Sequence, residues 1–381
     1  MSWLKVATVL TGAVLVLTGC GGAESGTATA GDPVAKIDYL PKDGAKDANP
    51  ATPVRLTVSN GTLDEVTLRN ADGKLIKGNI GVDKRTWNAG EPLGFDRTYT
   101  WAGKATGTDG KAVEVKGSFT TLKPARTLRA TINPIDNAVV GVGMPIKVQF
   151  DQDVPNREAV ERKLEVNTSV NVPGSWAWVN GREVHWRPQK YWPENTKVKA
   201  IAHLYGMDYG DGTFGAADLE TEFTIGRNQV VVANTASHKI DIMRNGQVFA
   251  SYKASYGQDA NPDLNTPNGT YIVMQKFDQW SFDNPQYGYT NVLKTWAVRF
   301  SNHGEFIHEN NDNAGNINAG VNSSHGCINL LGADAKAYYD TAIVGDPVEV
   351  TGASFTMPAK YDTFDWQIPW EQWQTMSAIK K

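Results

Sequence analysis

The sequence contains very few cysteines and almost no net charge. Only Cys20 and Cys327 occur among its 381 residues, which excludes a small scaffold held together by disulfides. There are 37 Lys and Arg residues against 41 Asp and Glu residues, a net charge of −4. A nucleic-acid surface usually needs a clear basic excess, so we expect no nucleic-acid partner.

Long hydrophobic runs are also scarce. The run from residue 6 to residue 17 follows Lys5 and is too short to span a bilayer comfortably, so residues 1–19 are predicted to be a secretory signal peptide. The ending Leu-Thr-Gly-Cys, at residues 17–20, resembles the lipobox of bacterial lipoproteins. The resemblance implies that Cys20 is lipidated and tethers the protein to the outer face of the cell membrane. A cleaved signal with an incidental cysteine is the alternative.

The body of the chain has the composition of a globular protein rich in strands. Hydrophobic residues make up 40% of it, and 12 Trp and 13 Tyr favour strands over helical bundles. Residues 20–33 are mostly Gly, Ala, Ser and Thr and are predicted to form a flexible stalk. Short alternating runs then predict a β-sandwich over 34–124, and similar runs predict a second one over 125–227. The second should contain a helix over 156–164.

The pattern changes to longer strands over residues 228–351, which we predict to form a third, β-rich domain. It should contain a hairpin turn at Asn245-Gly246, an aromatic loop over 277–289 and a helix near 333–341. Residues 352–381 carry many aromatic side chains and should pack back on the body of the protein. The expected fold class is mainly β, with two sandwiches followed by a β-rich domain that has one or two short helices.

One short region carries the residues for a reaction. His308 is followed after fifteen residues by Ser324-His325-Gly326-Cys327, which brings a thiol and two imidazoles within reach of one turn. Cysteine attacks as the thiolate, and histidine is suited to remove its proton. Gly326 lets the backbone turn so that its N–H group and that of Cys327 can both face a substrate carbonyl, as an oxyanion hole. A lipidated first cysteine would leave Cys327 without a disulfide partner.

This motif, followed by Asn329, resembles that of the L,D-transpeptidases of the bacterial cell wall. The stretch from Thr266 to Tyr271 and Trp296 fit the same family. The lipobox, the two sandwiches and the aromatic tail resemble its actinobacterial lipoprotein members, so the resemblance covers nearly the whole chain. It implies a YkuD-type catalytic domain over residues 228–351, preceded by two immunoglobulin-like domains.

The resemblance implies a role for each residue of the motif. Cys327 would be the nucleophile and His308 the general base. His325 would hold the loop, and the backbone N–H groups of Gly326 and Cys327 would bind the oxyanion. Glu309 stands where such relatives often have Ser, but the carbonyl that would orient the base does not depend on the side chain.

A second group of residues would contact the substrate. A lid tyrosine would reach the oxyanion, and its distance along the chain from the motif favours Tyr289, with Tyr287 as the rival. The other implied substrate contacts are His303, Gly304 and Asn329.

The implied reaction needs no metal or organic cofactor. The thiol would attack a tetrapeptide stem of peptidoglycan, release D-alanine and hold the stem as a thioester. The side-chain amine of a diamino acid on a neighbouring stem would then take the acyl group, which gives a 3→3 cross-link. The same resemblance implies that carbapenem-type β-lactams acylate Cys327. We expect the protein to act as a monomer.

The sequence leaves several alternatives. Water as the acceptor would make the enzyme an L,D-carboxypeptidase, and a protein acceptor would make it an enzyme that anchors proteins to the wall. A zinc site from His308, His325 and Cys327 would lack an acidic general base. A cell-wall-binding lipoprotein without activity is the alternative from another class. Three other histidines on predicted strands are expected to be ordinary residues without partners: His185, His203 and His238.

Overall fold

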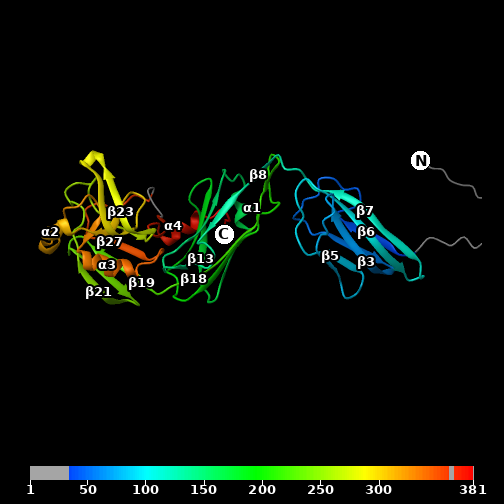
Figure 1. Cartoon of the computed structure of the whole chain (residues 1–381), viewed down its shortest axis with the longest axis horizontal. Coiled ribbons are helices and arrows are strands. Elements are labelled where there is room, and N and C mark those ends of the chain that lie inside the picture. The colour runs from blue at the N-terminus through cyan, green and yellow to red at the C-terminus, as the bar shows by residue number, and fades with distance from the viewer. Residues whose placement is uncertain (1–33, 360–363, 381) are drawn as a thin grey trace, which may run out of the picture. The chain divides into compact units, whose positions relative to one another are not determined.

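The computed structural model describes residues 34–359 and 364–380. The predicted signal peptide, the stalk and Cys20 therefore lie outside the described residues. Within these ranges strands predominate and helices are few and short, which confirms the expected mainly β fold class (Figure 1). None of the described helices is long and apolar enough to cross a membrane.

The described residues group into two compact units. The first unit consists of residues 34–43, 54–91 and 99–118, and the second contains 44–53, 92–98 and the residues from 119 onward. The proposed domain boundaries after residues 124, 227 and 351 stay a prediction.

The first unit is a sandwich of two sheets, drawn in blue and cyan in Figure 1. One sheet has the strand order β1-β2-β5-β4 and the other has the order β3-β6-β7. Trp87 and Trp101 come from opposite sheets and meet edge to face, with ring centroids 5.1 Å apart. This contact fills the space between the two sheets because alternate residues of each strand face inward. The strands are β1 (Lys36–Leu40), β2 (Arg55–Ser59), β3 (Gly61–Asn70), β4 (Gly78–Ile80), β5 (Thr86–Ala89), β6 (Thr98–Gly107) and β7 (Ala112–Thr120).

A second sandwich begins the second unit. Its sheets have the strand orders β13-β14-β11-β9 and β10-β18-β15-β12, with a small sheet β16-β17-β8 beside them. The predicted helix is α1 (Arg157–Glu161), capped by Asn156, whose Oδ1 accepts the N–H of Ala159 at 3.1 Å. It ends before the predicted residue 164, because Leu164 starts a strand that pairs with β15.

The strands of this sandwich are β8 (Arg126–Leu128), β9 (Ala130–Asn133), β10 (Val139–Val140), β11 (Ile146–Phe150), β12 (Leu164–Thr168), β13 (Gly174–Trp178), β14 (Glu183–Pro188), β15 (Lys197–Ala202), β16 (Asp208–Gly210), β17 (Thr213–Gly215) and β18 (Leu219–Ile225).

Two further sheets follow, with the orders β21-β20-β19-β27-β22 and β23-β24-β25-β26. The predicted turn at Asn245-Gly246 is confirmed, because both residues have positive φ (50° and 77°) and join β20 to β21. The predicted helix near 333–341 is also confirmed, as α3 (Gly332–Thr341). The remaining elements are β19 (Gln229–Asn234), β20 (Lys239–Arg244), β21 (Gln247–Lys253), β22 (Gly269–Ile272), β23 (Gln275–Asn284), η1 (Pro285–Tyr287), β24 (Tyr289–Arg299), β25 (Phe306–Glu309), η2 (Asn311–Asn313), α2 (Ala314–Ala319), β26 (Ile328–Leu330) and β27 (Pro347–Thr351).

The expected aromatic loop over 277–289 is wrong. Most of this segment is strand β23, which pairs antiparallel with β24 and turns through η1 (yellow in Figure 1). Aromatic side chains of the hairpin pack on β25, with the rings of Trp280 and Phe282 5.7 and 5.0 Å from that of Phe306. Such cross-strand aromatic contacts favour a strand over a loop.

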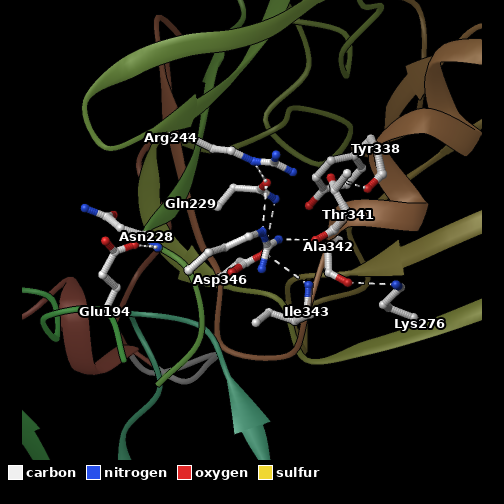
Figure 2. Close-up of polar contacts among 11 residues, drawn as sticks. Glu194, Asn228, Gln229, Arg244, Lys276, Tyr338, Thr341, Ala342, Ile343 and Asp346 are labelled. Atoms are coloured by element: carbon white, nitrogen blue, oxygen red, sulfur yellow. Dashed lines mark hydrogen bonds and ion pairs between the residues drawn. The ribbon is translucent and has the colours of Figure 1, made fainter. Parts of the chain in front are cut away.

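A buried carboxylate joins the start of β19 to the start of β27, which are parallel neighbours. Asp346 is fully buried, and its Oδ2 accepts from Nη2 of Arg227 at 2.9 Å, Nε2 of Gln229 at 3.2 Å and the N–H of Ile343 at 3.0 Å. Figure 2 shows Gln229 and Ile343 converging on Asp346. Burial raises the pKa of the Asp346 carboxyl to about 6, although Arg227 favours its charged form.

The C-terminal segment packs on the second sandwich. It contains η3 (Phe364–Trp366) and α4 (Trp370–Thr375), and α4 contacts β13. Trp373 is fully buried and its Nε1 donates to the carbonyl oxygen of Ser175 at 3.0 Å. The guanidinium of Arg187 lies over the ring of Trp373, 4.8 Å from its centroid, which is a cation–π interaction.

His185 also holds this segment, which corrects the expectation that it has no partner. It is buried in β14, and its ring nitrogens lie 2.6 Å from Asp365 and 2.8 Å from Glu183. His203 and His238 have partners as well, in Glu165 and Asn322. Glu183 lies two residues before His185 on the same face of β14, a local pair that the sequence could have shown, whereas Asp365, Glu165 and Asn322 are distant in the sequence.

Replacing Trp373 by Ala should destabilise the second sandwich by about 3–5 kcal/mol, because a large aromatic side chain is removed from a fully buried position. The measurement is chemical denaturation of the wild type and the variant, followed by tryptophan fluorescence. Gln372→Ala, at an exposed position of the same helix, is the control and should change the stability little. Equal stability of both variants would mean that the segment contributes nothing to folding.

Candidate active site

Two short parallel strands set the positions of the expected base and nucleophile. β25 pairs with β26, and His308 lies opposite Asn329. Both strands are almost completely buried, so their register is fixed by the apolar side chains on either side. Cys327 directly precedes β26, and it lines the same cavity as His308. Strand pairing therefore brings together two residues that lie far apart in the sequence.

The turn before Cys327 has a conformation that requires glycine. Gly326 has φ of 115°, a value that side-chain-bearing residues rarely adopt. Thr266 donates from Oγ1 to the carbonyl oxygen of Gly326 at 2.8 Å, and Ser324 donates from Oγ to the carbonyl oxygen of Cys327 at 2.6 Å. Two hydroxyl groups thus hold the turn that presents the thiol.

The N–H group of Gly326 does not face the cavity as expected. It donates to Oγ of Ser324 at 3.2 Å, so Ser324 both accepts and donates within the turn. Among the described residues, no hydrogen bond occupies the N–H of Cys327. The geometry therefore favours the Cys327 N–H as the backbone donor to an oxyanion.

His325 is exposed. Its ring lies against the two lid tyrosines, with centroids 5.5 Å from Tyr287 and 5.3 Å from Tyr289. His325 therefore connects the lid, which is the hairpin of β23, η1 and β24, to the turn before Cys327, and its expected role of holding that turn stays a prediction.

His308 has the environment of a neutral base. It is 5% exposed, and its Nδ1–H donates to the backbone carbonyl of Glu309 at 2.7 Å. A carbonyl oxygen only accepts, so the proton is on Nδ1 and Nε2 is left with its lone pair. Burial, assisted by the charge of Lys294, lowers the pKa of His308 to about 4, against the opposing effect of the Glu309 carbonyl.

Cys327 is a free, half-buried thiol whose Sγ lies 3.8 Å from the carbonyl oxygen of Gly304. Desolvation raises the pKa of the thiol to about 12, and the nearby carboxylate of Glu305 acts in the same direction. With the imidazole pKa near 4, the resting pair consists of neutral thiol and neutral imidazole. If Cys327 is the nucleophile, as predicted, its proton would have to leave Sγ during the attack, and the neutral His308 is suited to accept it.

The two candidate lid tyrosines differ in position. Tyr289 lines both cavities at Cys327, whereas Tyr287 lines only one of them. Burial and the proximity of Cys327 raise the pKa of the Tyr289 hydroxyl, which keeps it protonated and able to donate. The geometry favours Tyr289.

His303 and Gly304 lie between β24 and β25, beside the nucleophile. Nδ1 of His303 is 2.8 Å from Oε1 of Glu305, and Ser301 donates from Oγ to the other carboxylate oxygen. Glu305 is almost fully buried. Glu305 was not among the residues predicted from the sequence, although a Glu next to the apolar strand Phe306–Ile307 was a signal that a buried charge needs partners.

Two cavities meet at Cys327. The smaller, of about 380 Å³, is lined by His308, and the larger, of about 920 Å³, is lined by His303, Gly304 and Glu305. Lys294 and Asn310 in the smaller cavity were not predicted either, because a single Lys in an otherwise ordinary strand gives no local signal. The four residues shared by both cavities are Phe282, Tyr289, His325 and Cys327.

No three His, Cys, Asp or Glu side chains cluster as metal ligands in the part of the chain that the structure describes. The alternative of a zinc site at His308, His325 and Cys327 therefore has no ligand set there.

The catalytic-domain model of the L,D-transpeptidases matches residues 228–350, and the bacterial Ig domain model matches residues 45–208. L,D-transpeptidase 5 of Mycobacterium tuberculosis is 41% identical over 96% of this chain and 82% of its own length. The chain belongs to the L,D-transpeptidase family. L,D-transpeptidase 2 of the same species is 34% identical over 98% of this chain and 94% of its own length.

A solved structure extends the likeness to three dimensions. This transpeptidase resembles the structure of LdtMt1 in complex with imipenem with a TM-score of 0.50 and 32% identity. The match covers 60% of this chain and 100% of the other. The enzyme class predicted from the His308 to Cys327 motif is thus confirmed, whereas the roles of the individual residues stay predictions.

The neutral state of the thiol can be tested by alkylation with iodoacetamide. The rate at Cys327 should keep rising with pH to pH 9 and beyond, because the pKa of the thiol is about 12 and only the thiolate reacts rapidly. A Cys20→Ala background leaves one thiol in the protein. A plateau reached below pH 7 would instead indicate a thiolate–imidazolium ion pair.

The lid assignment predicts different effects for two similar substitutions. Tyr289→Phe should lower the rate of acylation by a carbapenem by about tenfold with little change in binding, because one hydroxyl that contacts the oxyanion is lost. Tyr287→Phe also removes a hydroxyl group from a ring that lies against His325, and it should leave the acylation rate almost unchanged. Stopped-flow kinetics measure the acylation rates of both variants. A lower rate for the Tyr287 variant alone would assign the oxyanion contact to Tyr287 instead of Tyr289.

Proposed function

We propose that this transpeptidase forms 3→3 cross-links between peptidoglycan stems through an acyl-enzyme on Cys327. The observation that carries the proposal is the position of Cys327, where two cavities meet beside a buried neutral histidine. A two-substrate reaction needs room for an acyl donor and an acceptor on the two sides of one thioester. The junction of the cavities supports that requirement.

In the first half-reaction, Sγ of Cys327 attacks the carbonyl carbon of the third stem residue and its proton moves to Nε2 of His308. The Cys327 N–H and the Tyr289 hydroxyl stabilise the oxyanion. The C–N bond to D-alanine then breaks, and the leaving amine takes the proton from His308. A pKa near 4 makes the imidazolium a strong acid, which favours this second transfer.

In the second half-reaction, the side-chain amine of a diamino acid attacks the thioester carbonyl. His308 removes a proton from the amine and returns one to Sγ as the C–S bond breaks, which leaves an amide and the free thiol. Over the two half-reactions, every bond that breaks is matched by one that forms and every proton is returned, so the proposed reaction needs no metal or organic cofactor.

The larger cavity is suited to the acceptor. Its walls include the carboxylates of Asp263, Asp283 and Glu305 against the one permanent cation Arg299, and negative charge attracts the ammonium form of the amine. Water as the acceptor would give an L,D-carboxypeptidase instead. Aromatic side chains of the lid limit the entry of water, since Phe282 lies over His308 with ring centroids 4.8 Å apart.

Three further proposals accompany this function. Carbapenem-type β-lactams acylate Cys327, in line with the relative that was solved with imipenem. Lipid on Cys20 holds the enzyme at the outer face of the cell membrane, where the stems lie. The enzyme acts as a monomer, because one chain supplies every residue of the site.

Cys327→Ala should form neither the acyl-enzyme nor the cross-linked product, because the only thiol in the site is lost. The wild type and the variant are incubated with a disaccharide tetrapeptide, and the products and the protein are weighed by mass spectrometry. Cys20→Ala, which removes the other thiol, should keep full activity. Cross-linked product from Cys327→Ala would refute the mechanism, and only the tripeptide from the wild type would show that the enzyme is a carboxypeptidase.

A further inference from the structure

A buried lysine lies in the smaller cavity, on the side of the general base. Lys294 of β24 is 9% exposed, and its Nζ donates to Oδ1 of Asn310 at 2.7 Å and to Oδ2 of Asp312 at 2.8 Å. A buried ammonium is costly unless it is paired. The side chain of Asp312 is 91% exposed, so solvent screens its charge, and the better shielded partner of the lysine is the half-buried Asn310.

The amide of Asn310 starts a line of hydrogen bonds that ends at the base. Nδ2 of Asn310 donates to Oδ1 of Asn329 at 2.6 Å. Nδ2 of Asn329 in turn lies 3.4 Å from Nε2 of His308, and Nδ1–H of His308 donates to the carbonyl of Glu309 at 2.7 Å. Four side chains from three strands and a loop thus form one path from the ammonium to the imidazole.

The lysine determines the direction of this path. An ammonium can only donate, so Asn310 must turn its oxygen to Lys294 and its NH₂ group to Asn329. Asn329 must then turn its own NH₂ group to His308, where Nε2 has to be the acceptor. We propose that Lys294 is a positioning residue, which through Asn310 and Asn329 keeps the general base His308 neutral with its lone pair on Nε2. The inference rests on the proposed function, in which His308 takes the proton of the thiol.

The charges around His308 support this role. The positive charge of Lys294 favours the neutral imidazole of His308. Glu309, which lies on β25 together with His308, favours the protonated form. The contact of Nδ2 of Asn329 with Nε2 is long, at 3.4 Å, so it keeps the resting lone pair free of a proton but is weak enough for the thiol to replace it. Among the described residues, the titratable groups that line the cavity of His308 or act on its pKa are Lys294 and Tyr289 from β24, Glu309 from β25, Asp312 from η2, and His325 and Cys327 from the turn before β26.

A second contact limits the expected effect. Asn313 also donates from Nδ2 to Oδ1 of Asn329, at 3.3 Å. Without Lys294 the amide of Asn329 would keep this support, so the path would be weakened but not lost. We therefore expect a shifted pH dependence and a reduced rate rather than an inactive enzyme.

The test is Lys294→Met, which removes the charge and the donor but keeps an unbranched apolar chain. The full chain is mixed with imipenem from pH 4 to pH 8, and single-turnover acylation is followed by the loss of β-lactam absorbance. Protonation of His308 blocks general base catalysis, so the rate falls at low pH with the pKa of His308. Loss of the cation should move this fall to higher pH by about 0.5 to 1 unit. At pH 7 the imidazole of His308 stays neutral in both proteins, so a fall in rate at that pH measures the lost orientation of Asn329, which we expect to be at most about tenfold.

Two variants separate the contributions of charge and orientation. Lys294→Arg keeps the charge and should leave the pH profile near that of the wild type. Asn310→Ala keeps the ammonium but interrupts the path, so it should lower the rate with a smaller shift of the profile. Lys336→Met is the control, because Lys336 is an exposed cation that pairs with Asp340 outside the cavity, and it should change nothing.

Two outcomes would contradict the inference. A Lys294→Met profile that coincides with the wild-type profile would overturn it, and a uniform loss of rate at every pH would reduce Lys294 to a packing residue. Circular dichroism at each pH shows whether the variants remain folded, and if Lys294→Met unfolds, Lys294→Gln is measured in its place with the same expected shift. No acylation of the wild type would contradict the proposed function rather than this inference.

Discussion

The pairing of β25 with β26 is the contact on which the site depends. Parallel strands need a long crossover, which here is the segment with η2, α2 and the nucleophile turn. The base lies on one strand and the thiol at the start of the other. Movement of the thiol relative to His308 would break main-chain hydrogen bonds in a buried sheet. A neutral pair needs this rigidity, because no ionic attraction aligns its two members.

The neutral pair has a further effect on the chemistry of the protein. A thiol whose pKa is raised by burial and by Glu305 exposes little thiolate at neutral pH. Oxidation and alkylation both follow the thiolate fraction, so a neutral Cys327 resists them without the protection of a disulfide. In the proposed mechanism the thiol becomes reactive only when a bound substrate places its carbonyl beside Sγ and His308 accepts the proton. The same raised pKa would then account for both the need for substrate and the resistance to oxidation.

The sequence predicted the fold class and the enzyme class. Fixed spacing singled out His308 and Cys327, and the structure places both in one cavity, while their roles stay predictions. The contacts missed were those made by distant residues: the pair of His185 with Asp365, the buried Glu305, and the path from Lys294 to His308. The segment 277–289 was misread because its aromatic residues are equally typical of a lid loop. Its pairing with β24 depends on a partner strand that local pattern does not reveal.

The buried carboxylate of Asp346 has a practical consequence for excising the catalytic domain. The boundary after residue 227 that the change of pattern suggests would remove Arg227, the cation that pairs with this carboxylate. A fragment beginning at residue 228 would retain Gln229 and the N–H of Ile343 as donors but would lose the cation that forms an ion pair with the buried carboxylate, leaving only the longer-range effect of Lys276. The fragment should therefore begin upstream of Arg227, so that the parallel neighbours β19 and β27 keep the ion pair at their shared end.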